Sequence, residues 1–318
     1  MLNQITFSQN LHGNMKIYKN LKIKESHKNS VIAIGNFDGI HLGHQKVINQ
    51  AKKKAKIYNM PFGLITFEPM PVMFFNQNVR NHRINSLNQK ILQLKKMKLD
   101  FMIIIKFNRL FSFLSPYQFI RKIIFKKVNS KYVFVSKNFK FGKNRKGNIK
   151  TLQKFENYFG YKIFITYPFK KFKKIISSTL IRKKIKLGKI KEVNKLLKRP
   201  WSVTGKVIRG MKRGRKIGFP TCNIKMSNYV IPKLGVYSVI VELGQNKKKG
   251  IANIGYRPTF NGQNLLLEVN IFGINKNLYN KEIKVNFIKF IRPEKKFKNL
   301  EQLKKQIKID ITQAKKNV

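Results

Sequence analysis

The chain has 318 residues, enough for two domains that can each bury a core of their own. Hydrophobic residues make up 42% of it and aromatic residues 12%, a composition that excludes a largely disordered protein. The only cysteine, Cys222, excludes an internal disulfide and a cysteine-rich zinc site.

The formal net charge of +57 allows two interpretations. A basic surface is typical of proteins that bind nucleic acids. However, only 12 of the 69 basic residues are arginines, which read base edges through bidentate contacts. Lys, Asn, Ile and Phe, all of which AT-rich codons can encode, are abundant throughout the chain. We therefore favour base composition as the main source of the charge and expect no specific nucleic-acid partner.

The apolar runs of the chain are short. Phe101–Ile105 is far below the length of a membrane span, and the first 14 residues lack the apolar centre of a signal peptide. We expect a cytoplasmic protein with no membrane partner, and the sequence leaves its oligomeric state open.

Strand-like and helix-like patterns alternate in the first half of the chain. This alternation predicts an α/β domain in which helices cover a parallel sheet, as in Rossmann-like folds. The predicted strands are Val31–Gly35, Phe62–Phe67, Phe101–Phe107, Tyr132–Ser136 and Lys162–Thr166. The predicted helices are Gly43–Tyr58, Leu87–Met97 and Tyr117–Phe125. In the first of them, Val47, Ile48, Ala51 and Ala55 lie on one side, which predicts its inner face.

The pattern changes after two short predicted helices, Thr179–Leu187 and Lys189–Leu197. Short β-rich segments separated by glycine and proline turns then predict an antiparallel barrel, followed by a final helix at Leu300–Lys315. The predicted barrel strands are Val203–Ile208, Gly235–Leu243, Gly250–Ile254, Leu265–Phe272 and Ile283–Ile291. We place the domain boundary between Arg182 and Trp201, which gives domains 1–185 and 186–318.

Three glycines and two histidines lie in Gly35–His44, between the first predicted strand and the first helix. An open α/β sheet places phosphate groups at this position, and glycines let the backbone approach a nucleotide closely. His41 and His44 are three residues apart at a helix start, so both can donate hydrogen bonds to one phosphoryl group. The alternatives are two capping histidines on a turn and a metal pair, which no further His or Cys cluster supports.

Three hydroxyl residues, Ser177, Ser178 and Thr179, stand at the start of another predicted helix. Such hydroxyls cap free N–H groups and can bond to phosphate oxygens. Arg182 lies three residues after Thr179 on nearly the same helix face and can neutralise a triphosphate. Taken alone, an ordinary N-cap beside a solvated arginine is the simpler interpretation; the histidine segment makes a phosphate site the favoured one.

A basic, glycine-rich segment follows the first predicted barrel strand. Its glycines, Gly210, Gly214 and Gly218, are four residues apart, and a loop of this kind can fold over a polyphosphate. Thr221 and Asn223 alternate along an extended segment, so their side chains point the same way. Their neutral oxygens suit Mg²⁺ when ATP phosphates and waters complete its shell. The alternative is a basic hairpin with both side chains on a solvated face.

Glu268 is one of only 12 acidic residues and lies in the apolar segment Leu265–Ile271. A carboxylate in such surroundings needs a partner or a chemical role. A general base and a structural glutamate paired with lysine both remain open. Cys222 points away from its neighbours Thr221 and Asn223, and we interpret it as a small core residue.

The motifs of the first half resemble those of prokaryotic FAD synthetases. Ile34–His44 is similar to the nucleotidyltransferase signature of that family, and three later segments are similar to its other motifs: Thr66–Pro71, Asn138–Gly142 and Ile176–Arg182. The resemblance implies adenylyl transfer, in which the FMN phosphate attacks the α-phosphorus of ATP and pyrophosphate leaves. It implies catalytic roles for His41, His44 and Arg182, and nucleotide or flavin contacts from Gly35, Phe37, Asp38, Asn138, Ser177, Ser178 and Thr179.

The motifs of the second half resemble those of riboflavin kinases. The similar segments are Gly218–Asn223, Gly250–Phe260, Leu267–Asn270 and Ile291–Phe297. The resemblance implies that Glu268 is the general base for the riboflavin 5′-hydroxyl, and that Thr221 and Asn223 hold Mg²⁺. It further implies ATP or flavin contacts from Gly210, Arg215, Gly218, Pro220 and Arg292; for Arg292 a surface strand-end role is the alternative.

Together the two resemblances cover about residues 15–315 and imply a bifunctional enzyme that makes FMN and FAD from riboflavin and ATP. Five positions depart from the family patterns, although none removes a proposed catalytic side chain: Met70, Ser136, Lys137, Asn270 and Asn280. The resemblance implies a glycine where this chain has Ser136 and a histidine where it has Asn270. Two alternatives remain, a riboflavin kinase with a degraded adenylyltransferase and, less favoured, a basic nucleic-acid-binding protein with an enzyme fold.

Overall fold

The computed structural model of the chain describes residues 15–76, 78–79, 81–171, 174–210, 213–259, 262–274 and 276–317. Contacts divide the chain into two compact units. Unit 1 comprises the residues up to Asn36 together with Gln45–Phe75 and Ile91–Pro168. Unit 2 comprises Phe37–His44, Asn76–Lys90 and the chain from Phe169 onward. The sequence predicts two consecutive domains that meet after residue 185. The two compact units are each made of several separate segments, so this boundary stays a prediction.

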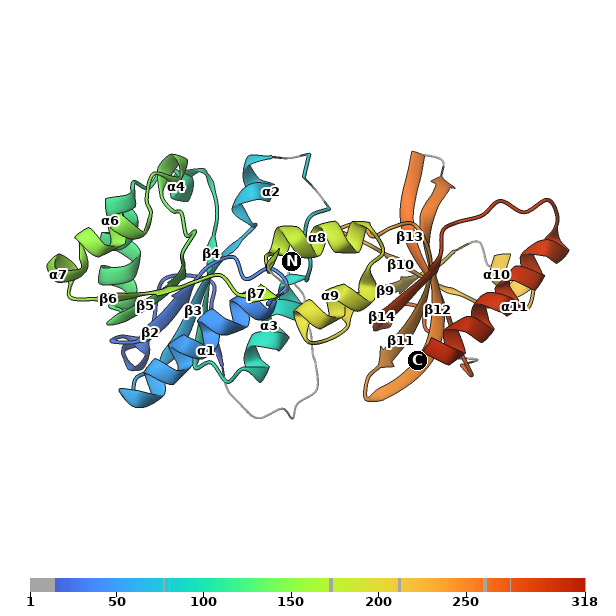
Figure 1. Cartoon of the computed structure of the whole chain (residues 1–318), viewed down its shortest axis with the longest axis horizontal. Coiled ribbons are helices and arrows are strands. Elements are labelled where there is room, and N and C mark those ends of the chain that lie inside the picture. The colour runs from blue at the N-terminus through green and yellow to red at the C-terminus, as the bar shows by residue number, and fades with distance from the viewer. Residues whose placement is uncertain are drawn as a thin grey trace. The chain divides into compact units, whose positions relative to one another are not determined.

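Unit 1 contains a six-stranded sheet in which all neighbouring strands are parallel (Figure 1). In spatial order its strands are β1 (Lys16–Tyr18), β4 (Phe101–Lys106), β3 (Phe62–Glu68), β2 (Val31–Ile34), β5 (Tyr132–Ser136) and β6 (Lys162–Thr166). The chain runs outward from β2 through β3 to β4, and then returns to the other side of β2 as β5. The order therefore reverses between β2 and β5, where open α/β sheets bind ligands.

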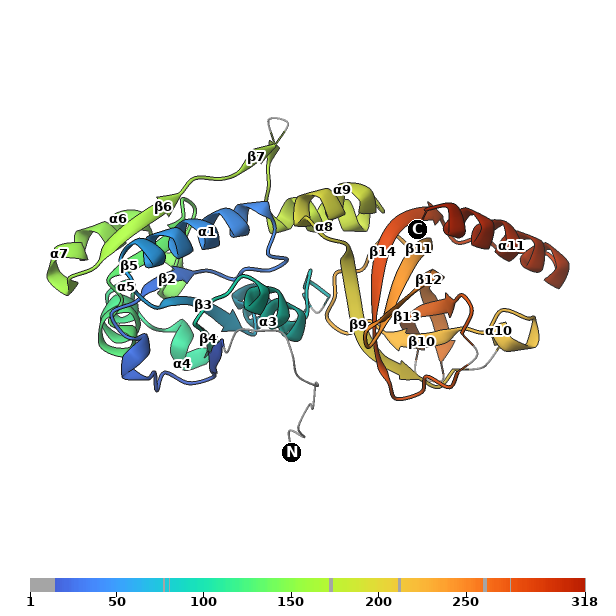
Figure 2. The ribbon, with the colours of Figure 1, turned by 90° about the horizontal axis from the view of Figure 1, so that it is seen from below.

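Apolar strands and amphipathic helices build the core of this unit. β2 is buried along its whole length, as expected for a parallel strand covered on both faces. The long helix α1 (Leu42–Ile57) buries the four residues predicted for its inner face: Val47, Ile48, Ala51 and Ala55. The helical segment Ile120–Val128 packs Ile120, Ile124 and Val128 against the strands. Helices therefore lie on both sides of the sheet (Figures 1 and 2).

The helix predicted at Tyr117–Phe125 differs in type from the one observed. A single α-helical turn, α5 (Pro116–Phe119), begins with a capping box between Ser115 and Gln118. It continues as a π-helix, η2 (Ile120–Val128). The buried positions at intervals of three and four residues fit both helix types approximately, so periodicity alone does not separate them.

Unit 2 contains a closed, six-stranded antiparallel barrel (Figure 2). In spatial order its strands are β10 (Cys222–Lys225), β13 (Gly262–Ile271), β12 (Asn246–Thr259), β11 (Gly235–Leu243), β14 (Glu282–Arg292) and β9 (Trp201–Ile208). Ile224, Leu267 and Ile254 are paired across three of these strands and belong to one buried apolar cluster. The residues next to them in sequence therefore point out of the barrel.

Three helices pack against the barrel. α8 (Ser178–Lys186) and α9 (Ile190–Leu197) place Ile181, Ile185 and Val193 in the same apolar cluster as the barrel residues Trp201 and Phe287. α11 (Leu300–Asn317) contacts the barrel through Ala314, which packs against Val236 and Ile251. The predicted fold, a parallel α/β part followed by an antiparallel barrel and a final helix, is confirmed.

The remaining elements are short. They are η1 (Glu25–His27), α2 (Pro71–Phe75), α3 (Leu87–Lys96), α4 (Arg109–Ser112), η3 (Lys143–Arg145), α6 (Ile149–Lys154), α7 (Glu156–Phe159), β7 (Lys170–Lys171), β8 (Lys174–Ile175) and α10 (Arg213–Lys216). Within the ranges that the structure describes, no helix combines the length and apolar character needed to cross a membrane.

Candidate functional site

The segment between β2 and α1 has an unusual backbone. Phe37, Gly39 and Ile40 have φ angles of +47°, +87° and +42°. Left-handed angles are strained for residues other than glycine, and most of all for a β-branched residue such as Ile40. Strain of this kind persists only where the surroundings hold the backbone, and it clusters at functional sites. We call residues 37–44 the histidine loop.

The buried carboxylate of Asp38 anchors this loop. It accepts hydrogen bonds from the backbone N–H of Ile84 at 3.0 Å and of Asn85 at 3.4 Å. It also forms a 2.6 Å ion pair with Nη2 of Arg182 on α8. The backbone carbonyl of Asp38 accepts a hydrogen bond from Ser178 at 2.9 Å. The structure therefore uses Asp38, predicted to contact the nucleotide, to tie the loop to α8 and to residues 84–85.

The rings of His41 and His44 stack with their centroids 3.7 Å apart. Nδ1 of His41 accepts hydrogen bonds from the backbone N–H of Gly43 and of His44, so the proton of this neutral ring lies on Nε2. A β-carbon on Gly43 would lie 3.1 Å from the His41 ring. The glycine of the His-x-Gly-His motif thus makes room for the first histidine. Phe37 contacts the edge of His44, with centroids 5.4 Å apart.

Both histidines are held in the neutral form. Burial, with smaller effects from Arg182 and Arg199, lowers the pKa of His41 to about 4. Burial and the neighbouring His41 lower the pKa of His44 well below 6.5. Nδ1 of His44 is buried and has no hydrogen-bond partner among the described residues. A buried polar nitrogen without a partner is costly, which points to a ligand that bonds to it.

The hydroxyl residues at the start of α8 have separate roles. Ser177 is the N-cap, and its side chain accepts a hydrogen bond from the N–H of Leu180. Ser178 bonds to the histidine loop as described above, and Thr179 is exposed. Arg182 uses Nε and Nη2 to bond to the His82 carbonyl and to Asp38. Its Nη1 donors take no part in these two bonds.

Gly35 and Asn138 belong to unit 1 and follow neighbouring strands at the point where the strand order reverses. Gly35 comes directly after β2, and its N–H donates to the carbonyl of Ile65. Asn138 is exposed in the turn after β5. Ser136, which replaces a family glycine, ends β5 in register with Thr166. This position therefore has ordinary strand geometry.

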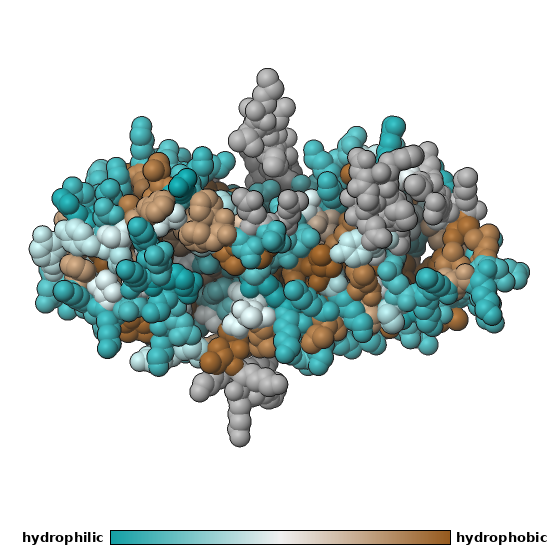
Figure 3. Space-filling model, turned by 90° about the horizontal axis from the view of Figure 1, so that it is seen from above, coloured by the Kyte–Doolittle hydropathy of each residue, from teal (hydrophilic) through white to brown (hydrophobic). Residues whose placement is uncertain are grey.

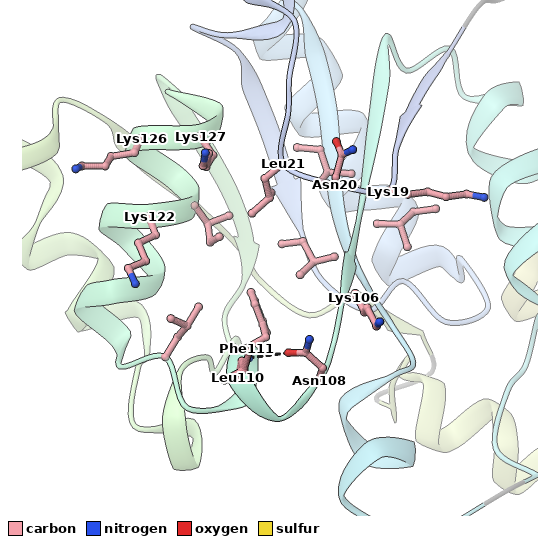
Figure 4. A pocket seen from close by; sticks show the side chains of 15 residues that line it. Lys19, Asn20, Leu21, Lys106, Asn108, Leu110, Phe111, Lys122, Lys126 and Lys127 are labelled. Atoms are coloured by element: carbon pink, nitrogen blue, oxygen red, sulfur yellow. Dashed lines mark hydrogen bonds between the residues drawn. The ribbon is translucent and has the colours of Figure 1, made fainter.

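Unit 1 also contains an apolar cavity of about 460 Å³ with lysines around it (Figure 4). β4 supplies Ile103 and Ile105, and the segment after β4 supplies Leu110 and Phe111. The N–H of Phe111 donates to the side chain of Asn108, which caps α4 and fixes this segment. The lysines that line the cavity are Lys19, Lys106, Lys122, Lys126 and Lys127. An apolar cavity of this size with a cationic rim suits a flat organic anion.

A row of polar residues crosses three barrel strands on the outer face. Asn223 on β10 pairs with Glu268 on β13, and Glu268 pairs with Asn253 on β12. Oδ1 of Asn223 is buried and has no hydrogen-bond partner among the described residues. Thr221, two residues earlier, is exposed. The unpartnered amide oxygen is in register with a carboxylate and two residues from a threonine hydroxyl, and oxygen donors of these kinds fit Mg²⁺. In the described part of the chain, no three His, Cys, Asp or Glu residues form a metal cluster.

Gly210, the first glycine of the glycine-rich segment, lies against Asn223 in this row. A β-carbon on Gly210 would be 1.8 Å from Nδ2 of Asn223, so a larger residue fits there only if the amide of Asn223 moves. Gly218 has a φ of +89°, which glycine adopts without strain. The carbonyl of Pro220 accepts a hydrogen bond from Asn270, the residue that replaces a family histidine. Arg215 is exposed; residues 211–212 lie outside the described ranges.

Arg292, predicted to contact flavin or its phosphate, is bound within the protein. Its Nε and Nη2 donate to the carboxylate of Asp310 on α11, at 2.9 and 2.7 Å. Asp310 is buried, so this pair fixes the last helix to the barrel.

Burial raises the pKa of the Cys222 thiol to about 11, which agrees with a core residue rather than a nucleophile.

A parallel α/β part, a strained loop with two stacked neutral histidines, and a barrel with an amide oxygen in register with a carboxylate are typical of an enzyme that transfers phosphorus-containing groups. Residues 23–180 match the family model described as FAD synthetase, and residues 197–318 match the one described as riboflavin kinase.

Whole-chain relatives carry both activities in their names. A bifunctional riboflavin kinase/FMN adenylyltransferase from Buchnera aphidicola subsp. Schizaphis graminum is 40% identical over 307 residues, covering 95% of this chain and 98% of that protein. The protein of the same name from Escherichia coli K12 is 34% identical over 281 residues, covering 88% and 90%. The chain belongs to the bifunctional riboflavin kinase/FMN adenylyltransferase family. The predicted family and its two activities are thereby confirmed, with riboflavin, FMN and ATP as substrates.

A solved structure also matches over most of the chain. A Streptococcus pneumoniae protein described as a macrolide-efflux protein is 32% identical with a TM-score of 0.83, covering 95% of this chain and 98% of that one. The match supports the fold described above.

Sequence reasoning missed two groups of residues near these sites. The cavity residues Leu110 and Phe111 lie in a short apolar segment. The one sequence feature that could have predicted a site there is that this segment follows a buried strand. Asn85 and Arg199 contact the histidine loop, yet neither belongs to a predicted motif. Contacts between segments so distant in sequence leave no local pattern.

Proposed function

We propose that the barrel phosphorylates riboflavin and that the histidine loop serves the adenylylation of FMN. In the kinase reaction, Glu268 accepts the proton of the riboflavin 5′-hydroxyl as this oxygen attacks the γ-phosphorus of ATP. The observation that carries this assignment is the buried, unpartnered oxygen of Asn223 in register with Glu268. Thr221 and Asn223 would hold Mg²⁺, which neutralises phosphate charge when bound. The loop with Gly210, Arg215 and Gly218 covers the phosphates.

In the second reaction, the FMN phosphate attacks the α-phosphorus of ATP and pyrophosphate leaves. Neutral His41 donates from Nε2, and the unpartnered nitrogen of His44 donates to a phosphoryl oxygen. Arg182 has donors left on Nη1 for a phosphate while it holds Asp38. Preorganised donors of this kind stabilise the charge of the transferring group without rearrangement.

We further propose that the enzyme works in the cytoplasm and binds no specific nucleic acid. The surface seen in Figure 3 is largely hydrophilic, with small separate apolar patches. The charge is carried mainly by lysine, which suits weak, salt-sensitive attraction rather than base recognition. Tight, base-specific binding at physiological salt in a filter-binding titration would contradict this.

The deciding experiment is an incubation of the purified chain with riboflavin, ATP and Mg²⁺, followed by separation of the flavins. We expect FMN first and FAD later, and no product when Mg²⁺ is replaced by EDTA. FMN without FAD would support a riboflavin kinase with a degraded adenylyltransferase, and no flavin product at all would overturn the proposal.

A further inference from the structure

The guanidinium group of Arg199 is a second polar contact that supports the histidine loop, in addition to the Asp38 anchor. Its Nη2 donates to the carbonyl of Gly39 at 2.8 Å and to the side-chain oxygen of Asn85 at 3.3 Å. Its Nη1 donates to the carbonyl of Leu197 at 3.1 Å, which fixes the group to the end of α9. Arg199 follows that helix and comes two residues before β9. A bridge therefore links the loop to the start of the barrel.

Burial makes this cation unusual. Desolvation lowers the pKa of Arg199 to about 10, still well above neutral pH, so the group stays charged and needs its hydrogen-bond partners. The three partners are oxygens of the protein. Holding a charged group in such surroundings for packing alone is unfavourable, because an apolar side chain of similar size avoids the desolvation cost.

The bond to Gly39 falls at the strained part of the loop. Gly39 has a φ of +87°, and a β-carbon there would lie 3.1 Å from the side chain of Ile84. Ile40, which follows directly, has a φ of +42° and is β-branched. A backbone in this conformation relaxes unless neighbouring groups hold it. Asp38 holds the loop before this point, and Arg199 holds the carbonyl that leads into Ile40 and His41.

We infer that Arg199 is a positioning residue for adenylyl transfer, which sets the His41–His44 pair through the Gly39 carbonyl. The inference rests on the proposed role of the histidine loop. Trp201 reinforces the arrangement, because its Nε1 donates to the carbonyl of Ile84 at 2.9 Å beside Asn85. The adenylylation site is thus supported by residues that lead into the first strand of the kinase barrel.

The test compares both reactions in Arg199→Ala and Arg199→Lys. With the alanine variant, we expect the kcat of FAD formation from supplied FMN to fall about 10- to 100-fold, because small displacements of catalytic groups have effects of this size. The KM values for FMN and ATP, and the kinase reaction, should stay near those of the parent. The Arg199→Lys variant keeps the charge but loses the planar guanidinium group. Its kcat should therefore lie between that of the parent and that of Arg199→Ala.

Arg121→Ala is the matched control, since Arg121 is an exposed arginine on η2 and its removal should change neither reaction. If Arg199→Ala does not fold, Asn85→Ala removes one acceptor of the same guanidinium and should give a smaller fall in the same kcat.

A parent enzyme that makes no FAD would overturn the proposed function itself. Parent-like kcat in the Arg199 variants, or equal losses in both reactions, would overturn this inference alone.

Discussion

Gly210 approaches Asn223 so closely that a β-carbon on Gly210 would lie 1.8 Å from the Nδ2 atom of Asn223. Gly210→Ala should therefore displace the amide whose oxygen is proposed to hold Mg²⁺. We expect the rate of FMN formation to fall by at least about 10-fold, the scale of a disturbed ligand in a metal site. FAD formation from supplied FMN, measured in the same preparation, serves as the control. Normal FMN formation at limiting Mg²⁺ would contradict the prediction.

Glu268→Ala should abolish FMN formation and leave FAD formation from FMN intact. Loss of a general base costs about 10²- to 10⁴-fold in rate. The isosteric change Glu268→Gln keeps the shape of the side chain and separates the loss of the base from the loss of packing. Both variants should be followed by separating FMN and FAD after reaction with riboflavin or with FMN. A Gln variant with parent-like FMN formation would exclude Glu268 as the base.

His44→Ala should have the reverse effect. It removes the ring that stacks on His41 at 3.7 Å and the buried nitrogen proposed to bond to a phosphoryl group. We expect the kcat of FAD formation to fall about 10²- to 10³-fold, as for the loss of one preorganised donor. FMN formation should remain. Equal impairment of both reactions in a folded His44→Ala protein would contradict the division into two sites.

The low pKa of His41 predicts how FAD formation depends on pH. Burial holds this pKa at about 4, whereas an unfolded chain would titrate near 6.5. The imidazole therefore stays neutral as the pH falls from 8 to 5, and kcat/KM should show no loss near 6.5 that comes from this group; the phosphates of FMN and ATP themselves titrate at about 6. Between pH 6.5 and 4 the unfolded chain takes up the proton first, so this residue lowers stability as the pH falls through that interval. A midpoint near 6.5 in kcat/KM that is present in the parent and absent from His41→Ala would argue against a buried, neutral His41.

Arg292 and Asp310 should contribute to stability rather than to flavin binding. Their side chains are 14% and 3% exposed, and removal of one partner leaves a buried charge alone. Arg292→Ala should lower the free energy of unfolding of the barrel by about 3–5 kcal/mol, as measured in urea. In the double variant with Asp310→Ala the loss should be smaller than the sum of the two single losses. Unchanged stability together with a raised KM for riboflavin would restore the flavin-binding role.

The parts of the fold that follow from the sequence are those with a long, regular pattern. α1 buries the four residues predicted for it, and β5, β6 and β11 have the predicted bounds. The three-residue strand β1 and the helices α6 and α7 were missed because they are shorter than the patterns that reveal periodicity. The π-helix η2 was predicted as an α-helix, since both types bury similar positions.

The candidate sites divide in the same way. Sequence motifs predicted roles for His41, His44, Glu268 and Asn223, and these roles stay predictions. The structure stacks His41 on His44 and sets Asn223 in register with Glu268, as residues close together in a motif or on paired strands can be. The partners of Asp38 and Arg292 were not predictable, since Arg182 and Asp310 reach them across the fold. The contribution of Arg199 likewise depends on the backbone of a loop 160 residues earlier in the chain.

Closure of the barrel has a consequence for how the enzyme behaves in a crowded solution. Each of its six strands is hydrogen-bonded to a neighbour on both sides, from β10 around to β9 and back. Exposed strand edges recruit other chains into intermolecular sheets, and a ring of strands offers no such template. The flavin-phosphorylating half should therefore resist this route to aggregation even where lysine repulsion is screened by salt.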